Sequence, residues 1–149
     1  MISKKRVLTF GTFDLFHYGH LSLLKRAANL GDELVVGVSS DEFNQQKKGR
    51  VPTFSFTQRC EMLHCLDFVD KTFKEDSFAQ KADYIRHCKA DILVMGSDWA
   101  GAFDHFKKFC HVVYLERTPE ISSSIIKNAI CTETQKHPGK QKLHLQLVA

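Results

Sequence analysis

No stretch of this sequence contains the roughly 20 consecutive apolar residues that a membrane-spanning helix needs. This absence argues against an integral membrane protein. The first ten residues, MISKKRVLTF, carry basic side chains but only a short apolar segment. They indicate a first β-strand rather than a signal peptide. We therefore expect a cytoplasmic protein that does not contact a membrane.

Paired cysteines and zinc-binding motifs are also lacking. The five cysteines form no C-x-x-C pair, and their odd number and scatter are typical of reduced thiols in a cytoplasmic protein. His17 and His20 form an H-x-x-H pair, but it has neither the glutamate of H-E-x-x-H nor a nearby cysteine. We expect no metal ion held by protein side chains alone.

A dense basic stripe, the usual mark of a nucleic-acid-binding protein, is missing as well. The formal net charge is only +4, and part of it comes from lysines near the C-terminal end. The local cluster QQKKGR, residues 45–50, fits a small phosphorylated ligand better. We expect small-molecule partners and no nucleic acid.

The composition that is present is that of a globular domain. The chain has 149 residues, of which 43% are hydrophobic and 26% are charged, and this length favours one domain with one core. Apolar β-rich runs alternate with helical patterns. Strands are expected at 6–10, 33–40, 71–75, 91–96 and 111–117, and helices at 21–31, 57–69, 77–90, 101–110 and 122–130. This alternation predicts an α/β fold, a Rossmann-like open parallel sheet of about five strands with helices on both faces.

Two segments do not follow this alternation. Residues 41–54 are polar and contain Gly49 and Pro52, so we expect a loop with room for one helical turn. Residues 132–149 are rich in lysine and interrupted by a Pro-Gly pair. We expect a catalytic domain over 1–131, where the last helix is complete, and a mobile C-terminal extension over 132–149. The alternating LHLQLVA at its end is an alternative edge strand.

The decapeptide GTFDLFHYGH, residues 11–20, follows the first predicted strand directly. In open parallel sheets, ligands bind beyond the carboxyl ends of the strands. Gly11 lets the backbone approach a ligand, and Gly19 permits a tight turn before the helix. His20 then lies near a helix N-terminus, where free N–H groups favour an anion. His17 and His20 can donate to phosphate oxygens and carry positive charge at neutral pH.

A second segment of the same character is RTPEISSSII, residues 117–126. Arg117 ends a predicted strand and can bind phosphate oxygens through its forked guanidinium group. The run of serines supplies hydroxyl and N–H groups at a new helix N-terminus, although Ser122 alone is equally explained as a helix cap. Two anion sites at one sheet edge fit a triphosphate.

These two segments resemble the signatures of a known family. GTFDLFHYGH matches G-x-F-D-x-x-H-x-G-H of the cytidylyltransferases, and RTPEISSSII is similar to their R-T-x-x-I-S-T-T-x-I. GDELVVGVSSDEFN and VMGSDW resemble the bacterial glycerol-3-phosphate cytidylyltransferases in particular. The resemblance covers about residues 5–131.

The resemblance implies an enzyme that converts CTP and sn-glycerol 3-phosphate into CDP-glycerol and pyrophosphate. It implies Mg²⁺ bound with the nucleotide, and a homodimer. Three alternatives stay open. The acceptor is a phospho-amino alcohol, a phospho-amino acid amide or a sugar phosphate; the transferred group is adenylyl; or the chain is a nucleotide-binding module without turnover.

The resemblance also implies site residues. The catalytic residues would be His17, His20, Lys47 and Arg117. CTP would be bound by Gly11, Thr12, Phe13, His17, His20, Lys48, Arg50, Asp98, Arg117, Thr118, Ile121, Ser122, Ser123 and Ser124, although which of Lys48 and Arg50 meets the triphosphate is open. Lys47, Lys81 and Arg59 would contact the acceptor. By its pattern alone, Lys81 reads as a solvated lysine on a helix.

The sequence departs from the family pattern at two places. Asp67 stands where the relatives carry an arginine, which removes one expected positive charge. Pro119 and Glu120 replace a Glu-Gly pair in the second signature. A carboxylate there is tolerated next to a triphosphate only if it points away.

Overall fold

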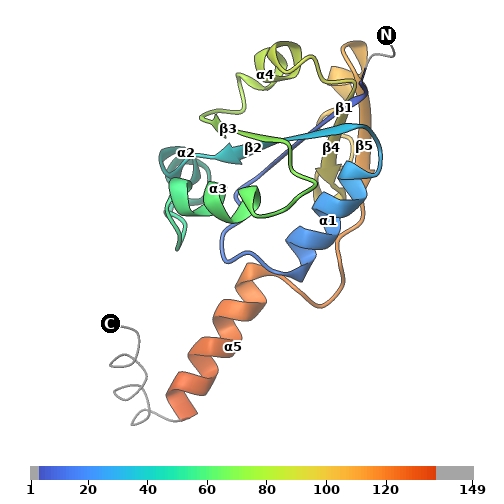
Figure 1. Ribbon diagram of the computed structural model, residues 1–149. Helices are drawn as coiled ribbons and strands as arrows, with labels where there is room; N and C mark the ends of the chain where they lie inside the picture. Colours follow the sequence, from blue (N-terminus) through green and yellow to red (C-terminus); the bar gives the residue numbers. More distant parts are fainter. Residues whose placement is uncertain (1–3, 137–149) are drawn as a thin grey trace.

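The computed structural model describes residues 4–136. Its centre is a sheet of five parallel strands in the order β3-β2-β1-β4-β5 (Figure 1). The strands are β1 (Arg6–Gly11), β2 (Glu33–Ser39), β3 (Lys71–Glu75), β4 (Ile92–Gly96) and β5 (His111–Leu115). The predicted α/β fold with an open parallel sheet is confirmed.

Helices cover both faces of this sheet, as predicted (Figure 1). On one face, α1 (Tyr18–Ala28) and α3 (Phe56–His64) bury Leu24 and Leu63 against alternate strand residues. On the other face, Ile85 of α4 (Lys81–His87) and Phe106 of the short 3₁₀ helix η2 (Asp104–Lys108) do the same. The central strands therefore read as nearly continuous apolar runs, because both of their faces are buried.

The strand order creates the crevice that the site occupies. β1 pairs with β2 on one side and with β4 on the other. The chain therefore adds β2 and β3 on one side of β1 and then crosses over to add β4 and β5 on the other. Ligands of doubly wound sheets bind at such a crossover, outside the carboxyl ends of the strands. The ends at Gly11 and Gly96 are followed there by the β1–α1 loop and the 3₁₀ helix η1 (Ser97–Trp99).

The first helix begins earlier than expected. It starts at Tyr18 rather than at residue 21, and it ends at Ala28. His17 is its N-cap and His20 lies within its first turn. Gly19 therefore does not form a turn before the helix, because it already belongs to the helix.

The segment expected to be a loop contains a helix of eight residues, α2 (Asp41–Lys48). Ser40 caps its start, and Gly49 ends it in the left-handed conformation at φ 68°. Acidic residues in the first turn and lysines in the last turn complement the helix dipole. Expecting a loop was wrong, because these capping and charge signals outweigh the polar composition.

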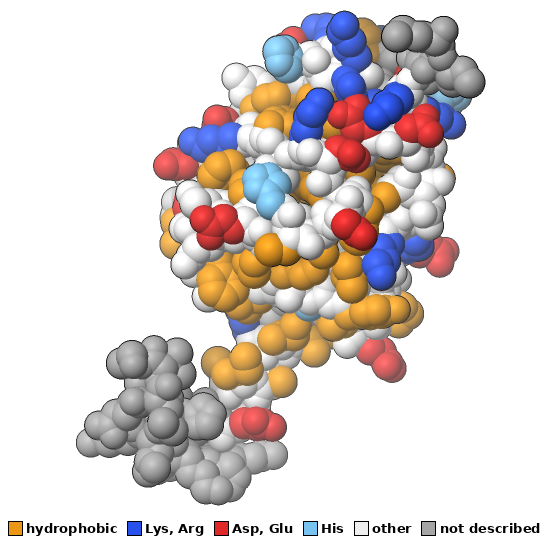
Figure 2. All heavy atoms as spheres, viewed as in Figure 1, with side chains coloured by type: hydrophobic (Ala, Val, Ile, Leu, Met, Phe, Trp, Pro, Cys, Tyr) orange, Lys and Arg blue, Asp and Glu red, His pale blue; other side chains and the backbone are white. Residues whose placement is uncertain are grey.

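The final helix α5 (Ser123–Lys136) continues past residue 131, where we expected it to be complete. It projects from the body of the molecule (Figure 1), and hydrophobic side chains lie along it and on the adjoining surface (Figure 2). The alternative edge strand at 143–149 lies outside the described residues. Within residues 4–136, no helix is both long and apolar enough to span a bilayer.

Candidate active site

A pocket of about 350 Å³ opens at the carboxyl ends of β1 and β4. It is walled by the β1–α1 loop, the start of α1, the end of α2 and the start of α5. All residues expected to bind the nucleotide line it: Gly11, Thr12, Phe13, His17, His20, Lys48, Arg50, Asp98, Arg117, Thr118, Ile121, Ser122, Ser123 and Ser124. The fold thus brings both signature segments and the basic segment to one cavity.

His17 and His20 stack face to face in this pocket, with ring centroids 3.8 Å apart. Backbone N–H groups set their orientation: Gly19 donates to His17 Nδ1 at 3.0 Å, and His17 donates to His20 Nδ1 at 3.3 Å. Because each Nδ1 accepts a hydrogen bond, the proton of each neutral ring is on Nε2. Each ring can therefore donate a hydrogen bond to a ligand through its Nε2–H group.

The charge of this histidine pair differs from our expectation. Burial, followed by the neighbouring His17, lowers the pKa of His20 to about 4. Burial and then Arg117 lower the pKa of His17 as well. These shifts favour uncharged rings at neutral pH before a ligand binds, in contrast to the positive charge that we expected. In this state each ring can still donate through Nε2.

Gly19 explains why this stacking is possible. A Cβ atom at residue 19 would lie 2.8 Å from Cε1 of His17 and 3.1 Å from Cγ2 of Ile121. Both distances are shorter than ordinary contacts, so a side chain would displace the His17 ring or the loop before α5. The glycine is needed for close packing and not for a turn.

The opposite wall is built by Arg117 and the start of α5. Arg117 Nη1 donates to Asp98 Oδ2 at 2.9 Å, and both side chains are about half exposed. Ser122 Oγ accepts from Ile125 N at 3.2 Å and so caps the helix, whereas Ser123 Oγ donates to the carbonyl oxygen of Asp14 at 2.8 Å. The hydroxyl hydrogen of Ser122 remains free to donate to a ligand.

Among the polar and charged side chains that line the pocket, sequence reasoning did not assign Asp14, Asn44 and Lys127 to the site. Lys127 lies one helical turn after Ser123, a spacing that could have placed it in the pocket. Burial tends to raise the pKa of Asp14, but backbone N–H groups of the segment before α3 and Lys127 lower it overall. Its carboxylate joins that segment, the β1–α1 loop and α5.

Lys48 and Arg50 both line the pocket, so the structure does not separate them. Lys48 Nζ donates to Thr12 Oγ1 at 3.3 Å. Burial and then the charge of Arg50 lower the pKa of Lys48. A bound anion would relieve this repulsion between the two cations.

Lys47 and Lys81 lie beside the pocket rather than in its wall. Lys47 Nζ donates to Ser39 Oγ at 2.8 Å, and Lys81 forms an ion pair with Glu75. Lys81 Nζ lies 3.6 Å from the ring centroid of Phe10, which itself lines the pocket. Lys81 is only 1% exposed, so interpreting its pattern as a solvated lysine was wrong.

Arg59 has a different environment from the expected one. Its side chain is fully buried, and it donates to the carbonyl oxygens of Thr12, Ser39 and Phe54 and to Asp41 at 2.6–3.0 Å. These bonds and its full burial give Arg59 a structural role behind the pocket. Its contact with the acceptor stays a prediction. Asp67 is exposed in the turn after α3 and is not part of the pocket wall.

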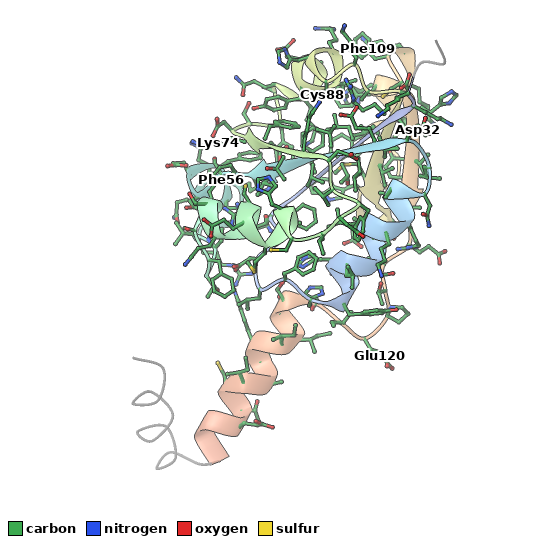
Figure 3. All side chains as sticks on the ribbon, in the orientation of Figure 1. Asp32, Phe56, Lys74, Cys88, Phe109 and Glu120 are labelled. Atoms are coloured by element: carbon green, nitrogen blue, oxygen red, sulfur yellow. The ribbon has the colours of Figure 1, made fainter. Side chains whose placement is uncertain are left out.

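Glu120 points away from the body of the molecule, as Figure 3 shows, and is exposed. Its φ is 60°, a left-handed conformation that costs roughly 1–2 kcal/mol for residues other than glycine. This strain accounts for the glycine of the family pattern at this position.

We therefore expect Glu120→Gly to stabilise the protein by about 0.5–1 kcal/mol, after the added flexibility of glycine in the unfolded chain is subtracted. Urea unfolding measures the change. Glu120→Ala is the control, because it removes the carboxylate but keeps the strained Cβ, and it should give no comparable gain. Equal gains in both variants would mean that charge, and not backbone strain, is responsible.

Comparison with known proteins agrees with this geometry. The family model described as cytidylyltransferase-like matches residues 8–129. Glycerol-3-phosphate cytidylyltransferase of Bacillus spizizenii is 48% identical over 123 residues, covering 83% of this chain and 95% of the relative. The Staphylococcus aureus protein of the same name is 45% identical over 126 residues, covering 85% and 95%.

Among solved structures, the lipopolysaccharide core biosynthesis protein of Thermoplasma volcanium superposes with a TM-score of 0.65 at 28% identity. The superposition covers 78% of this chain and 98% of that protein. The match to the family model, residues 8–129, includes both signature segments, residues 11–20 and 117–126. The chain belongs to the cytidylyltransferase-like family.

Proposed function

We propose that this enzyme transfers the cytidylyl group of CTP to sn-glycerol 3-phosphate and releases pyrophosphate. The observation that carries the proposal is the pocket that brings the His17–His20 pair and Arg117 with the serines of α5 together, beside a pair of lysines. The names of the Bacillus spizizenii and Staphylococcus aureus relatives support the choice of glycerol 3-phosphate.

In this mechanism, an anionic phosphate oxygen of the acceptor attacks the α-phosphorus in line, and the bond to the pyrophosphate oxygen breaks. No proton has to be removed from the nucleophile, so catalysis consists of positioning and charge stabilisation. His17 and His20 would donate through Nε2 to oxygens that gain negative charge. Arg117 and the start of α5 would hold the departing pyrophosphate, and Lys47 would bring in the acceptor phosphate.

We assign Mg²⁺ to the nucleotide rather than to a site made of side chains. Within residues 4–136, no three or more His, Cys, Asp and Glu side chains are grouped to hold a metal ion. The carboxylates of Asp14 and Asp98 face the pocket, but they are paired with Lys127 and Arg117. When bound with the triphosphate, Mg²⁺ would neutralise part of its charge.

The aromatic rings near the lysines favour glycerol 3-phosphate over a phospho-amino alcohol. Lys81 Nζ lies over Phe10, and Lys47 Nζ lies 4.4 Å from the ring centroid of Phe43. Phe78 is within 5.7 Å of both ammonium groups. Faces of these three phenylalanine rings are therefore occupied by the protein's own cations, which would also repel a substrate ammonium.

Pyrophosphate release tests the proposal. We would combine each of the four ribonucleoside triphosphates with glycerol 3-phosphate, phosphocholine, phosphoethanolamine and a sugar phosphate. Release should require CTP together with glycerol 3-phosphate. Turnover with ATP or with an amino-alcohol phosphate would establish one of the alternatives, and no release with any pair would indicate a module that only binds nucleotides.

The pH dependence of this reaction should reveal Lys47. Burial lowers the pKa of Lys47 to about 8, although Glu75 opposes this shift. We expect kcat/KM for the acceptor to fall as the pH rises through about 8, because neutral Lys47 no longer attracts phosphate. Lys47→Arg should move the fall to higher pH, since a guanidinium stays charged. A wild-type profile that stays flat to about pH 9.5, short of the ordinary lysine pKa, would contradict the assignment.

We further infer a homodimer and a cytoplasmic location. Ile125 and Ile130 on α5 are 51% and 60% exposed, and a second copy of the chain could cover them. The five cysteines are free, as in a reducing compartment. Light scattering of the wild type and of Ile130→Asp would test the dimer, which the charge should weaken.

A further inference from the structure

Glu75 ends β3 at the same sheet edge as the pocket, and it is 1% exposed. Both of its carboxylate oxygens have partners: Oε1 pairs with Lys81, and Oε2 accepts from Ser39 Oγ at 2.8 Å. Ser39 Oγ in turn accepts from Lys47 Nζ at 2.8 Å. One buried carboxylate therefore connects the two lysines that lie beside the pocket.

Such an arrangement is a poor way to stabilise a fold. Removing a carboxylate and an ammonium group from water costs several kcal/mol for each ion, and the attraction between them often only balances that cost. The pair forms at the carboxyl ends of the strands, beside Phe10 of the pocket wall. Its position therefore points to a role in the site.

The charges and the geometry suggest what that role is. Two ammonium groups and one carboxylate sum to one positive charge, which suits the attraction of a phosphate group. A free lysine side chain loses rotamer entropy when it binds a ligand. Holding both lysines before the acceptor arrives removes this cost from the binding step.

We propose that Glu75 is a positioning residue for the phosphorylated acceptor, which holds Lys81 directly and Lys47 through the hydroxyl of Ser39. This inference rests on the proposed transfer to such an acceptor. Glu75 does not contact the nucleotide pocket, since it is absent from the residues lining it. Its loss should therefore affect the acceptor and leave CTP binding unchanged.

The test compares Glu75→Gln and Ser39→Ala with the wild-type protein. Glutamine keeps the shape of Glu75 and removes its charge, and alanine at residue 39 breaks only the link to Lys47. We expect the KM for glycerol 3-phosphate to rise about tenfold in Glu75→Gln, the scale of one charge-assisted hydrogen bond, and several-fold in Ser39→Ala. The KM for CTP should change less than about twofold in both variants, within ordinary mutational variation.

Glu33→Gln is the matched control. Glu33 also pairs with two cations, Arg6 and Lys71. It lies at the amino end of β2, however, and the pocket is at the carboxyl ends of the strands. Its neutralisation should leave both KM values unchanged. Equal rises in both KM values in Glu75→Gln, or the same rise in Glu33→Gln, would overturn the proposal, because they would indicate general loss of structure.

Calorimetric titration of the CTP-loaded protein with glycerol 3-phosphate, in the presence of a metal chelator and with a check that no pyrophosphate is released, separates this inference from the proposed reaction. Weaker binding in Glu75→Gln supports the positioning role, even if the wild type released no pyrophosphate and the proposed reaction failed. Unchanged binding in Glu75→Gln would overturn the positioning role while leaving the reaction intact. Absence of binding to the wild type would overturn both.

Discussion

Replacing His17 or His20 by alanine should lower kcat by about 10²-fold or more, the usual scale for one donor to developing charge. The expectation rests on the stacked rings, whose Nδ1 atoms are held by backbone N–H groups so that Nε2–H is available. Pyrophosphate release under saturating CTP and acceptor measures the effect.

Two further variants test how the histidines act. Glutamine places an amide donor near the position of Nε2, so His20→Gln should recover part of the activity that His20→Ala loses. His64→Ala is the control, because His64 is exposed on α3 and bonds to Thr72 outside the pocket. Turnover near that of the wild type in a folded His20→Ala protein would remove His20 from the mechanism.

The largest loss of stability should follow from Arg59→Met. The change removes the donor of the partly buried carbonyl oxygens of Thr12 and Phe54 and one of the two donors of the buried Ser39 carbonyl, which keeps its bond from Asn44. It also leaves the Asp41 carboxylate without its cation. We expect the free energy of unfolding to fall by about 3 kcal/mol or more. Buried acceptors that lose their donor, and a carboxylate that loses its cation, are costly because water cannot replace the lost partner. Denaturant unfolding followed by circular dichroism gives the value.

Arg86→Met is the matched control for this change. Arg86 pairs with Asp83 on the surface of α4, and both side chains are more than half exposed, so its loss should cost less than about 1 kcal/mol. Arg59→Lys should fall between the two, because one ammonium group cannot reach all of the partners. If Arg59→Met were as stable as the control, Arg59 would not be needed to stabilise the fold. The predicted contact of Arg59 with the acceptor would then explain the residue better.

Local signals in the sequence were sufficient for the sheet and for the nucleotide pocket. Apolar runs that alternate along the chain with helical patterns identify the strands, and the two signature segments follow β1 and β5. In a parallel sheet the carboxyl ends of the strands meet at one edge, so these segments had to meet. The α2 helix was missed because its caps, Ser40 and Gly49, are short signals within a polar stretch.

The sequence by itself thus determined the fold class, the edge of the sheet at which ligands bind and most of the polar and charged residues that line the pocket. Tertiary structure alone decided which charged groups are buried. Lys81 is buried against Glu75, Arg59 donates to Thr12, 47 residues away in the chain, and His20 is uncharged at neutral pH. Burial and pKa depend on what distant segments pack around a side chain, and a pattern along the chain contains no such information.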